Sequence, residues 1–102
     1  MTTFEERERA YESRFAHDEE LRFKAMARRN RLLGEWVAEK LGKSGDDAAA
    51  YAKEVVRADF DEPGDEDVFR KVRADLDPSM VSDEELRQKM RELLVVAADQ
   101  VS

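Results

Sequence analysis

The sequence of 102 residues has no cysteine and only one histidine. Without cysteine the chain can form neither a disulfide nor a thiolate zinc site, and this agrees with a reducing compartment. With His17 as its single histidine, the chain cannot build a catalytic triad or a metal site with two histidines. Catalysis is therefore not expected, and His17 is expected to be solvated or to lie at the start of a helix.

The sequence also lacks the loops that commonly hold phosphates or calcium. No glycine-rich loop of the Walker or dinucleotide type is present. Asp59, Asp61 and Gly64 match positions of a calcium loop, but Pro63 and Arg70 occupy two positions that should carry ligands. Neither a metal site nor a required cofactor is therefore expected.

Long hydrophobic runs and net positive charge are missing as well. No apolar run reaches the roughly 18 residues of a membrane span, and the N-terminus lacks the basic-then-apolar order of a signal peptide. The formal net charge of −7 disfavours broad binding to nucleic acid or to anionic membranes, because both attract cationic proteins. We expect a cytoplasmic protein with no nucleic-acid partner and no direct membrane insertion.

Charged residues, in contrast, make up 42% of the sequence, a share typical of long solvated helices rather than of sheets with alternating faces. A chain of this length forms one small domain. The predicted fold class is all-α: a small four-helix bundle with a mobile, partly disordered N-terminal segment.

The first apolar stripe has helical spacing and runs from near Thr3 to Leu41. One long helix could carry it, with Gly42 as its left-handed C-terminal cap and Gly34 as a weak point in the middle. One face of this helix would carry Phe4, Tyr11, Phe15, Met26, Leu33, Trp36 and Val37. The stripe thickens where Leu21, Phe23, Met26, Leu32, Leu33, Trp36 and Val37 come close together.

Three further helices are predicted from their capping residues. The second opens at Ser44 and stops near Asp59. The third is capped by Asp65 and ends at Asp77-Pro78, because proline disfavours helix at the residue before it. The fourth opens with a capping box of Ser82 and Glu85. Their expected buried faces are Ala48, Tyr51, Ala52 and Val55; then Val68, Val72 and Leu76; and then Leu86, Met90, Leu93, Leu94, Ala97 and Val101.

The opening stretch sets three aromatic residues among charged ones. Burying them contributes about 1.5–3 kcal/mol each, whereas ordering about sixteen residues costs on the order of 1–2 kcal/mol apiece, so the stretch should not fold alone. Asp18 is a suitable helix cap, which divides the chain into an N-terminal segment, 1–17, mobile when free, and a helical bundle domain, 18–102. The aromatics could fold into a partner's groove or simply cap the end of the bundle.

Positive charge concentrates in FKAMARRNRLL, which contains Arg28, Arg29 and Arg31. These residues, with Arg22 and Lys24 nearby, could form a solvated helix face that balances acidic neighbours. The alternative is a surface site for a nucleotide phosphate or an acidic partner, since guanidinium groups bind both.

Several runs of the sequence resemble the zeta subunit of the alpha-proteobacterial ATP synthase, the intrinsic ATPase inhibitor. They are TTFEERERAYE, RFAHDEELRFKAMARRNRLLGEWVAEKLG, YAKEVVRADF and GDEDVFRKVRADL. The resemblance covers nearly the whole chain up to about Leu76 and is less distinctive from Asp77 onward.

This resemblance implies a non-catalytic regulator that suppresses ATP hydrolysis by the F1 sector and leaves synthesis largely free. It implies a four-helix fold whose N-terminal segment becomes a helix at a catalytic alpha/beta interface, next to the gamma rotor, and acts as a one-way pawl. The implied partners are the F1-ATPase alpha, beta and gamma subunits. The protein would be a monomer when free, and peripheral on the inner face of the cytoplasmic membrane when bound to the ATP synthase.

The resemblance also implies site residues. Phe4, Tyr11 and Phe15 match the inhibitory segment as apolar contacts, and Arg7, Arg9 and Arg14 would make charged contacts at the rim of the interface. The family's ability to bind ATP or ADP on the bundle surface points to Arg28, Arg29 and Arg31, while Leu33 and Trp36 are expected in the core. The alternative functions are a small ATP/ADP-binding regulatory protein and a general helical adaptor.

Overall fold

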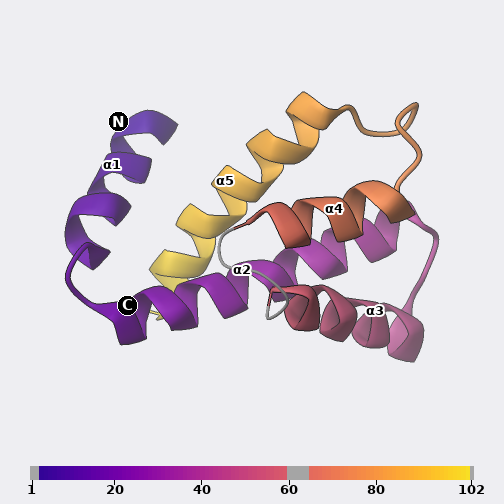
Figure 1. Ribbon diagram of the computed structural model, residues 1–102, viewed down its shortest axis with the longest axis horizontal. Coiled ribbons are helices and arrows are strands. Elements are labelled where there is room, and N and C mark those ends of the chain that lie inside the picture. The colour runs from indigo at the N-terminus through magenta and orange to yellow at the C-terminus, as the bar shows by residue number, and fades with distance from the viewer. Residues whose placement is uncertain (1–2, 60–64, 102) are drawn as a thin grey trace.

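The computed structural model describes residues 3–59 and 65–101, which form five helices (Figure 1). The helices are α1 (Phe4–Phe15), α2 (Glu19–Lys40), α3 (Gly45–Ala58), α4 (Glu66–Asp75) and α5 (Asp83–Val101). The all-α class is therefore confirmed, and α2 to α5 are the four helices expected after the N-terminal segment. Figure 1 shows α3 running back along α2, and α1 standing beside α5 at one end of the molecule.

The first apolar stripe is divided between two helices rather than carried by one. The backbone of Asp18 is extended, with φ −119° and ψ 91°, and its carboxylate accepts a hydrogen bond from the Leu21 amide at 3.0 Å. The expected cap at Asp18 is thus confirmed, and one continuous helix from Thr3 to Leu41 is wrong. The chain turns between Phe15 and Asp18, so α1 can fold back toward α5.

Other predicted helix ends agree with the structure. Gly42 has a φ of +76° beyond α2, the left-handed conformation that favours glycine. Before α5, the Glu85 amide donates to Ser82 Oγ at 3.1 Å, and the Ser82 amide donates to Glu85 Oε1 at 3.4 Å. Asp65 precedes α4 as expected, but its side chain does not cap the helix. Most of the turn expected before it, together with Asp61, Pro63 and Gly64, lies outside the described residues.

The main core lies between α2, α3, α4 and α5. Its buried residues are Leu33, Val37, Ala38, Tyr51, Val55, Val68, Val72, Leu76, Val81, Leu86 and Met90. Leu33 is buried as predicted, and Trp36 is half-buried against this core. A second, smaller cluster, here called the end cluster, joins α1 to α2 and α5. It consists of Phe15, Ala25 and Ala98, with Tyr11, Leu21, Leu94 and Val101 packed against it.

Candidate functional site

The N-terminal helix α1 has clear local reasons to form. The Thr3 hydroxyl accepts from the Glu6 amide at 3.2 Å, and the Thr3 amide donates to the Glu6 carboxylate at 3.4 Å, which completes a capping box. Glu5 and Glu6 lie in the first turn and Arg14 in the last. Each charge is therefore opposite in sign to the nearby end of the helix dipole, which stabilises the helix. The segment is therefore a defined helix from Phe4 onward.

The aromatic face of α1 is turned toward the body of the protein. Phe15 is only 1% exposed in the end cluster, and its ring centroid lies 4.9 Å from that of Tyr11. Phe4 is half-buried, with the Arg91 guanidinium 5.3 Å from its ring centroid. The expected partial disorder is therefore wrong for residues 3–15, while the expected mobility of the segment stays a prediction. Aromatic burial alone would not offset the backbone entropy of this segment, but the capping box and the contacts with α5 stabilise it as well.

Two ion pairs complete the α1–α5 interface. Arg7 Nη2 lies 2.7 Å from Asp99 Oδ2, and Arg91 binds both carboxylate oxygens of Glu8 at 2.8 and 2.9 Å. Arg7, Asp99 and Arg91 remain largely accessible to solvent, so solvent screens both pairs and each contributes little to stability. Phe15 is thus the most deeply buried residue of α1, and exposed ion pairs flank the apolar contacts of the end cluster.

The three arginines predicted at the rim of a partner interface have different surroundings. Arg7 is engaged by α5, as described. Arg9 is exposed, and so is Arg14, whose guanidinium lies 5.8 Å from the Phe15 ring centroid. The aromatic residues thus share one face of α1, whereas Arg9 and Arg14 are accessible at its surface.

Acidification is expected to weaken the α1–α5 interface. Hydrogen bonds from Arg91 hold the pKa of Glu8 below its ordinary value of 4.5. A carboxylate whose pKa is lowered by docking stabilises the docked form above that ordinary value, and this contribution is lost as the pH falls through the lowered pKa. Backbone carbon chemical shifts of residues 4–15, followed from neutral pH into the acid range, would report the loss.

The matched control for this titration is Glu8→Gln. Several other carboxyl groups, such as Glu66, Asp75 and Asp77, also have lowered pKa values and will titrate in the same range. The variant keeps those groups and removes only the Glu8 titration, so its α1 signals should change less steeply with pH. Identical curves for the two proteins would exclude Glu8 as the group responsible.

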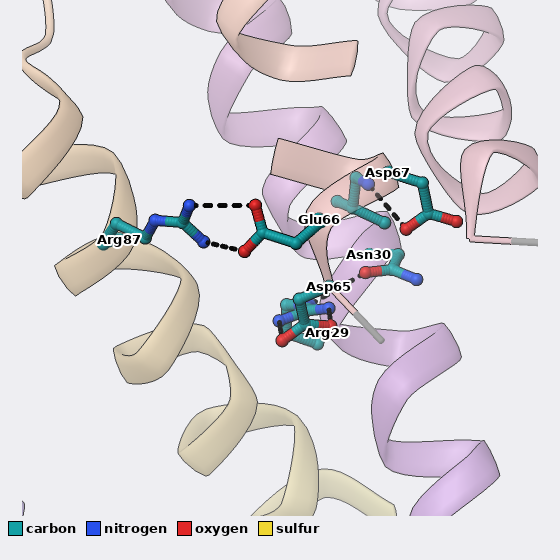
Figure 2. A network of polar contacts seen from close by, with 7 residues as sticks. Arg29, Asn30, Asp65, Glu66, Asp67 and Arg87 are labelled. Carbon is teal, nitrogen blue, oxygen red and sulfur yellow. Dashed lines mark hydrogen bonds and ion pairs between the residues drawn. The ribbon is translucent and has the colours of Figure 1, made fainter. Parts of the chain in front are cut away.

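Arg29 is buried within the molecule and does not lie on its surface. Its side chain is 1% exposed, and Nη2 lies 2.8 Å from Asp65 Oδ1 while Nε donates to Asn30 Oδ1 at 2.8 Å. Figure 2 shows this network at the start of α4, with the neighbouring Glu66 bound by Arg87 of α5 at 2.9 and 3.2 Å. Arg29 therefore ties α4 to α2, and Asp65 binds it instead of capping α4.

Arg28 and Arg31 remain at the surface, beside a groove between α2 and α3, here called the α2–α3 groove, with a volume of about 980 Å³. Phe23 also lines this groove and is 62% exposed, so the expectation that it joins the apolar stripe is wrong. A signal was available in the sequence, because Phe23 lies off the helical face that carries Phe15 and Leu33. The cationic side chains around the groove are Lys24, Arg28, Arg31, Lys53 and Arg57.

Neither a metal-binding group nor a membrane-spanning helix is found in the described part of the chain. Residues 3–59 and 65–101 include no group of three or more histidine, aspartate or glutamate side chains that could hold a metal ion. Across the same residues, no helix has the length and apolar character needed to cross a membrane. His17 is exposed in the turn between α1 and α2, in agreement with a solvated position near a helix start.

Comparison with known proteins finds a matching family model and matching solved structures. The family model described as ATPase inhibitor subunit zeta matches residues 1–100. A solved structure described as a solution NMR structure is 57% identical in sequence, with a TM-score of 0.72, and the match covers 78% of this chain and 93% of that chain. No curated protein matches the sequence.

Proposed function

The chain belongs to the ATPase inhibitor subunit zeta family, a family of non-catalytic inhibitor subunits, and from this premise we propose that it suppresses ATP hydrolysis by the F1 sector of ATP synthase. The match to nearly the whole chain carries this proposal. With one histidine and no cysteine, the sequence offers neither a catalytic triad nor a thiolate nucleophile, which agrees with a regulatory role.

Helix α1 is the element that we assign to inhibition. We propose that it leaves α5 and inserts at a catalytic alpha/beta interface, next to the gamma rotor. Three observations support this role. Its aromatic residues share one face, its helical form is already capped, and it is joined to the bundle through the end cluster and exposed ion pairs. A helix that is already capped loses less conformational entropy on binding than a disordered segment does.

The release of α1 exposes apolar surface and breaks two ion pairs. Exposing Phe15 costs about 1.5–3 kcal/mol, the half-buried rings of Phe4 and Tyr11 add to this cost, and the two exposed ion pairs to α5 contribute little. The undocked form is then a minor state of the free protein, and a partner that binds this form better will shift the population toward it. Insertion at F1 would bury the same aromatic side chains again, which offsets the cost of release.

The inserted helix would act as a one-way pawl. Rotation in the hydrolytic direction would tighten its fit at the interface, whereas rotation in the synthetic direction would expel it. The protein would act as a monomer on F1, at the inner face of the cytoplasmic membrane. The remaining helices would hold α1 at the correct height against the alpha and beta subunits.

The direct test measures ATP hydrolysis by cognate F1 with and without the full chain, and ATP synthesis by the complete enzyme in energised vesicles. Hydrolysis should fall with increasing chain, while synthesis at saturating chain should remain close to its uninhibited rate. Unchanged hydrolysis at saturation would refute the inhibitory function. Equal loss of both activities would refute the pawl and leave inhibition in place.

A second candidate function is regulatory binding of ATP or ADP. The observation that favours it is the α2–α3 groove, where Arg28 and Arg31 lie beside apolar side chains. Guanidinium groups suit phosphates, and an apolar wall suits a base. Arg29 is excluded from such a surface site by its burial and its bond to Asp65.

A further inference from the structure

We propose that the α2–α3 groove is a second docking surface, which binds an acidic amphipathic helix of the F1 sector while α1 inserts elsewhere. This proposal rests on the proposed function, because it names a contact of the same complex. It assigns a face of the bundle to F1 and gives that face a role distinct from the role of α1.

The shape of the groove suits a helix. Its α2 wall includes Phe23, Ala27 and Arg31, which follow one another at intervals of four residues, and the wall continues in this way to residue 35. Its α3 wall extends over a similar length, from residue 45 to residue 57. At about 1.5 Å per residue, twelve residues correspond to about 18 Å, or roughly three helical turns. A groove of this length between two helices can hold a third helix along the seam.

Both walls of the groove carry small apolar side chains. Ala27 of α2 and Ala48, Ala52 and Val56 of α3 line it, and Phe23 stands at one end with 62% of its surface exposed. An exposed phenylalanine beside small apolar residues is a favourable contact for a bulky apolar side chain of a partner. Phe23 and Met80 are the large hydrophobic residues most exposed in the described part of the chain, and only Phe23 lines this groove.

The charge around the groove is opposite to that of the protein. Five cationic side chains line it, from both walls, and Glu35 is the acidic residue beside them, although the chain carries a net charge of −7. The α2 cations have solvent-exposed partners on their own helix or on α5. Lys24 lies 3.3 Å from Glu20, Arg31 lies 3.5 Å from Glu35, and Arg28 Nε donates to Gln100 Oε1 at 2.6 Å. These contacts are solvent-exposed and can be exchanged for acidic groups of a partner.

The position of the groove would allow F1 to bind the groove and α1 at the same time. Phe23 lies five residues after the cap of α2 at Asp18, so the groove begins about 8 Å from the turn that carries α1. Val101, at the end of α5, also lines it. A helix of F1 held in the groove would therefore fix the bundle close to the point from which α1 projects.

The first test is a cross-link from the groove, which the absence of native cysteine makes specific. Ala49→Cys, at an exposed position that lines the groove, keeps Phe23 and the cationic residues in place. The full chain with this substitution, labelled with a maleimide photo-cross-linker, is mixed with cognate F1, irradiated and digested for mass spectrometry. The expected product joins residue 49 to an acidic helical segment of F1. The matched control is Met80→Cys, labelled in the same way, which should give no product with that segment. If the labelled Ala49→Cys chain inhibits F1 yet forms no such product, the docking proposal is wrong and the proposed function stands.

The second test reverses charge without changing α1. Arg31→Glu combined with Lys53→Glu is expected to raise the Kd for F1 about tenfold or more, through slower association that depends on salt. Maximal inhibition at saturating chain should be unchanged, because α1 is intact. Lys40→Glu with Lys43→Glu is the control, since it makes the same change in net charge away from the groove.

These outcomes separate the hypotheses. An unchanged Kd for the groove variant overturns the docking surface. Loss of ATP binding by that variant, with an unchanged Kd for F1, would instead assign the groove to nucleotide. Absence of inhibition by the unmodified chain would remove the proposed function itself.

Discussion

A chain that lacks residues 1–16 is expected to leave ATP hydrolysis by cognate F1 uninhibited at concentrations where the full chain inhibits strongly. The deletion removes α1, and with it the aromatic residues that we assign to insertion. Among the described residues, no member of the main core belongs to α1. Asp18, the cap of α2, is retained, so the four remaining helices should fold. Circular dichroism and a thermal melt would verify this before the ATPase assay.

Substitutions within α1 test the same assignment without a deletion. Phe4→Ala with Tyr11→Ala removes two half-buried aromatic rings and leaves Phe15 in the end cluster. Contact residues of this kind contribute about 2 kcal/mol or more at an interface, so the concentration needed for half-inhibition should rise by at least about tenfold. Glu12→Ala with Ser13→Ala is the matched control on the exposed side of α1 and should inhibit normally. Full inhibition by the truncated chain would refute α1 as the inhibitory element.

A tether can show whether α1 must leave α5. Glu8→Cys and Arg91→Cys replace two residues that bind each other in the docked form, and a short bis-maleimide would join them covalently. If release precedes insertion, the tethered chain should lose inhibition, whereas the same double variant blocked with two separate maleimides should keep it. Inhibition by the tethered chain would mean that α1 acts while docked.

The local features of the fold follow from the sequence because their causes are local. The Asp18 cap, the left-handed Gly42 and the capping box of Ser82 and Glu85 each depend on residues within a few positions of one another. The buried faces of α3 and α4 follow from helical spacing in the same way. Such features can be predicted without knowledge of which helices pack together.

The docking of α1 on the end of the bundle was one of two alternatives that the sequence left open, and its contacts could not be predicted because the partners are distant in the sequence. Arg7 binds Asp99, and Glu8 binds Arg91, across separations of 92 and 83 residues. Charged residues are frequent in this chain, so the sequence is compatible with many other ion pairs between distant residues. The same limit applies to Arg29. Its sequence context indicated a surface cation, but in the structure it is buried and paired with Asp65 at the start of α4.

Gly34 gives the sharpest contrast between local and tertiary effects. Helix propensity alone makes Gly34→Ala stabilising by about 1 kcal/mol, because glycine is a poor residue in a helix interior. In the structure, however, a Cβ at this position would lie 2.5 Å from Ala52 Cα and 3.3 Å from Val55 Cγ2. Gly34 therefore permits the close approach of α2 and α3, which also form the walls of the α2–α3 groove.

Gly34→Ala is accordingly expected to destabilise the protein by about 2–3 kcal/mol, since the nearest atom belongs to the backbone of α3 and no rotamer change can relieve the contact. For a domain of about 100 residues this corresponds to a decrease in Tm of about 10–20 °C. Urea unfolding and calorimetry would measure it. Gly42→Ala is the control: no atom lies within 4 Å of a Cβ there, so only its positive φ is strained, at a cost of about 1 kcal/mol. A Gly34→Ala variant more stable than the parent would mean that α2 and α3 can separate at no cost, and that packing at this seam does not hold the bundle together.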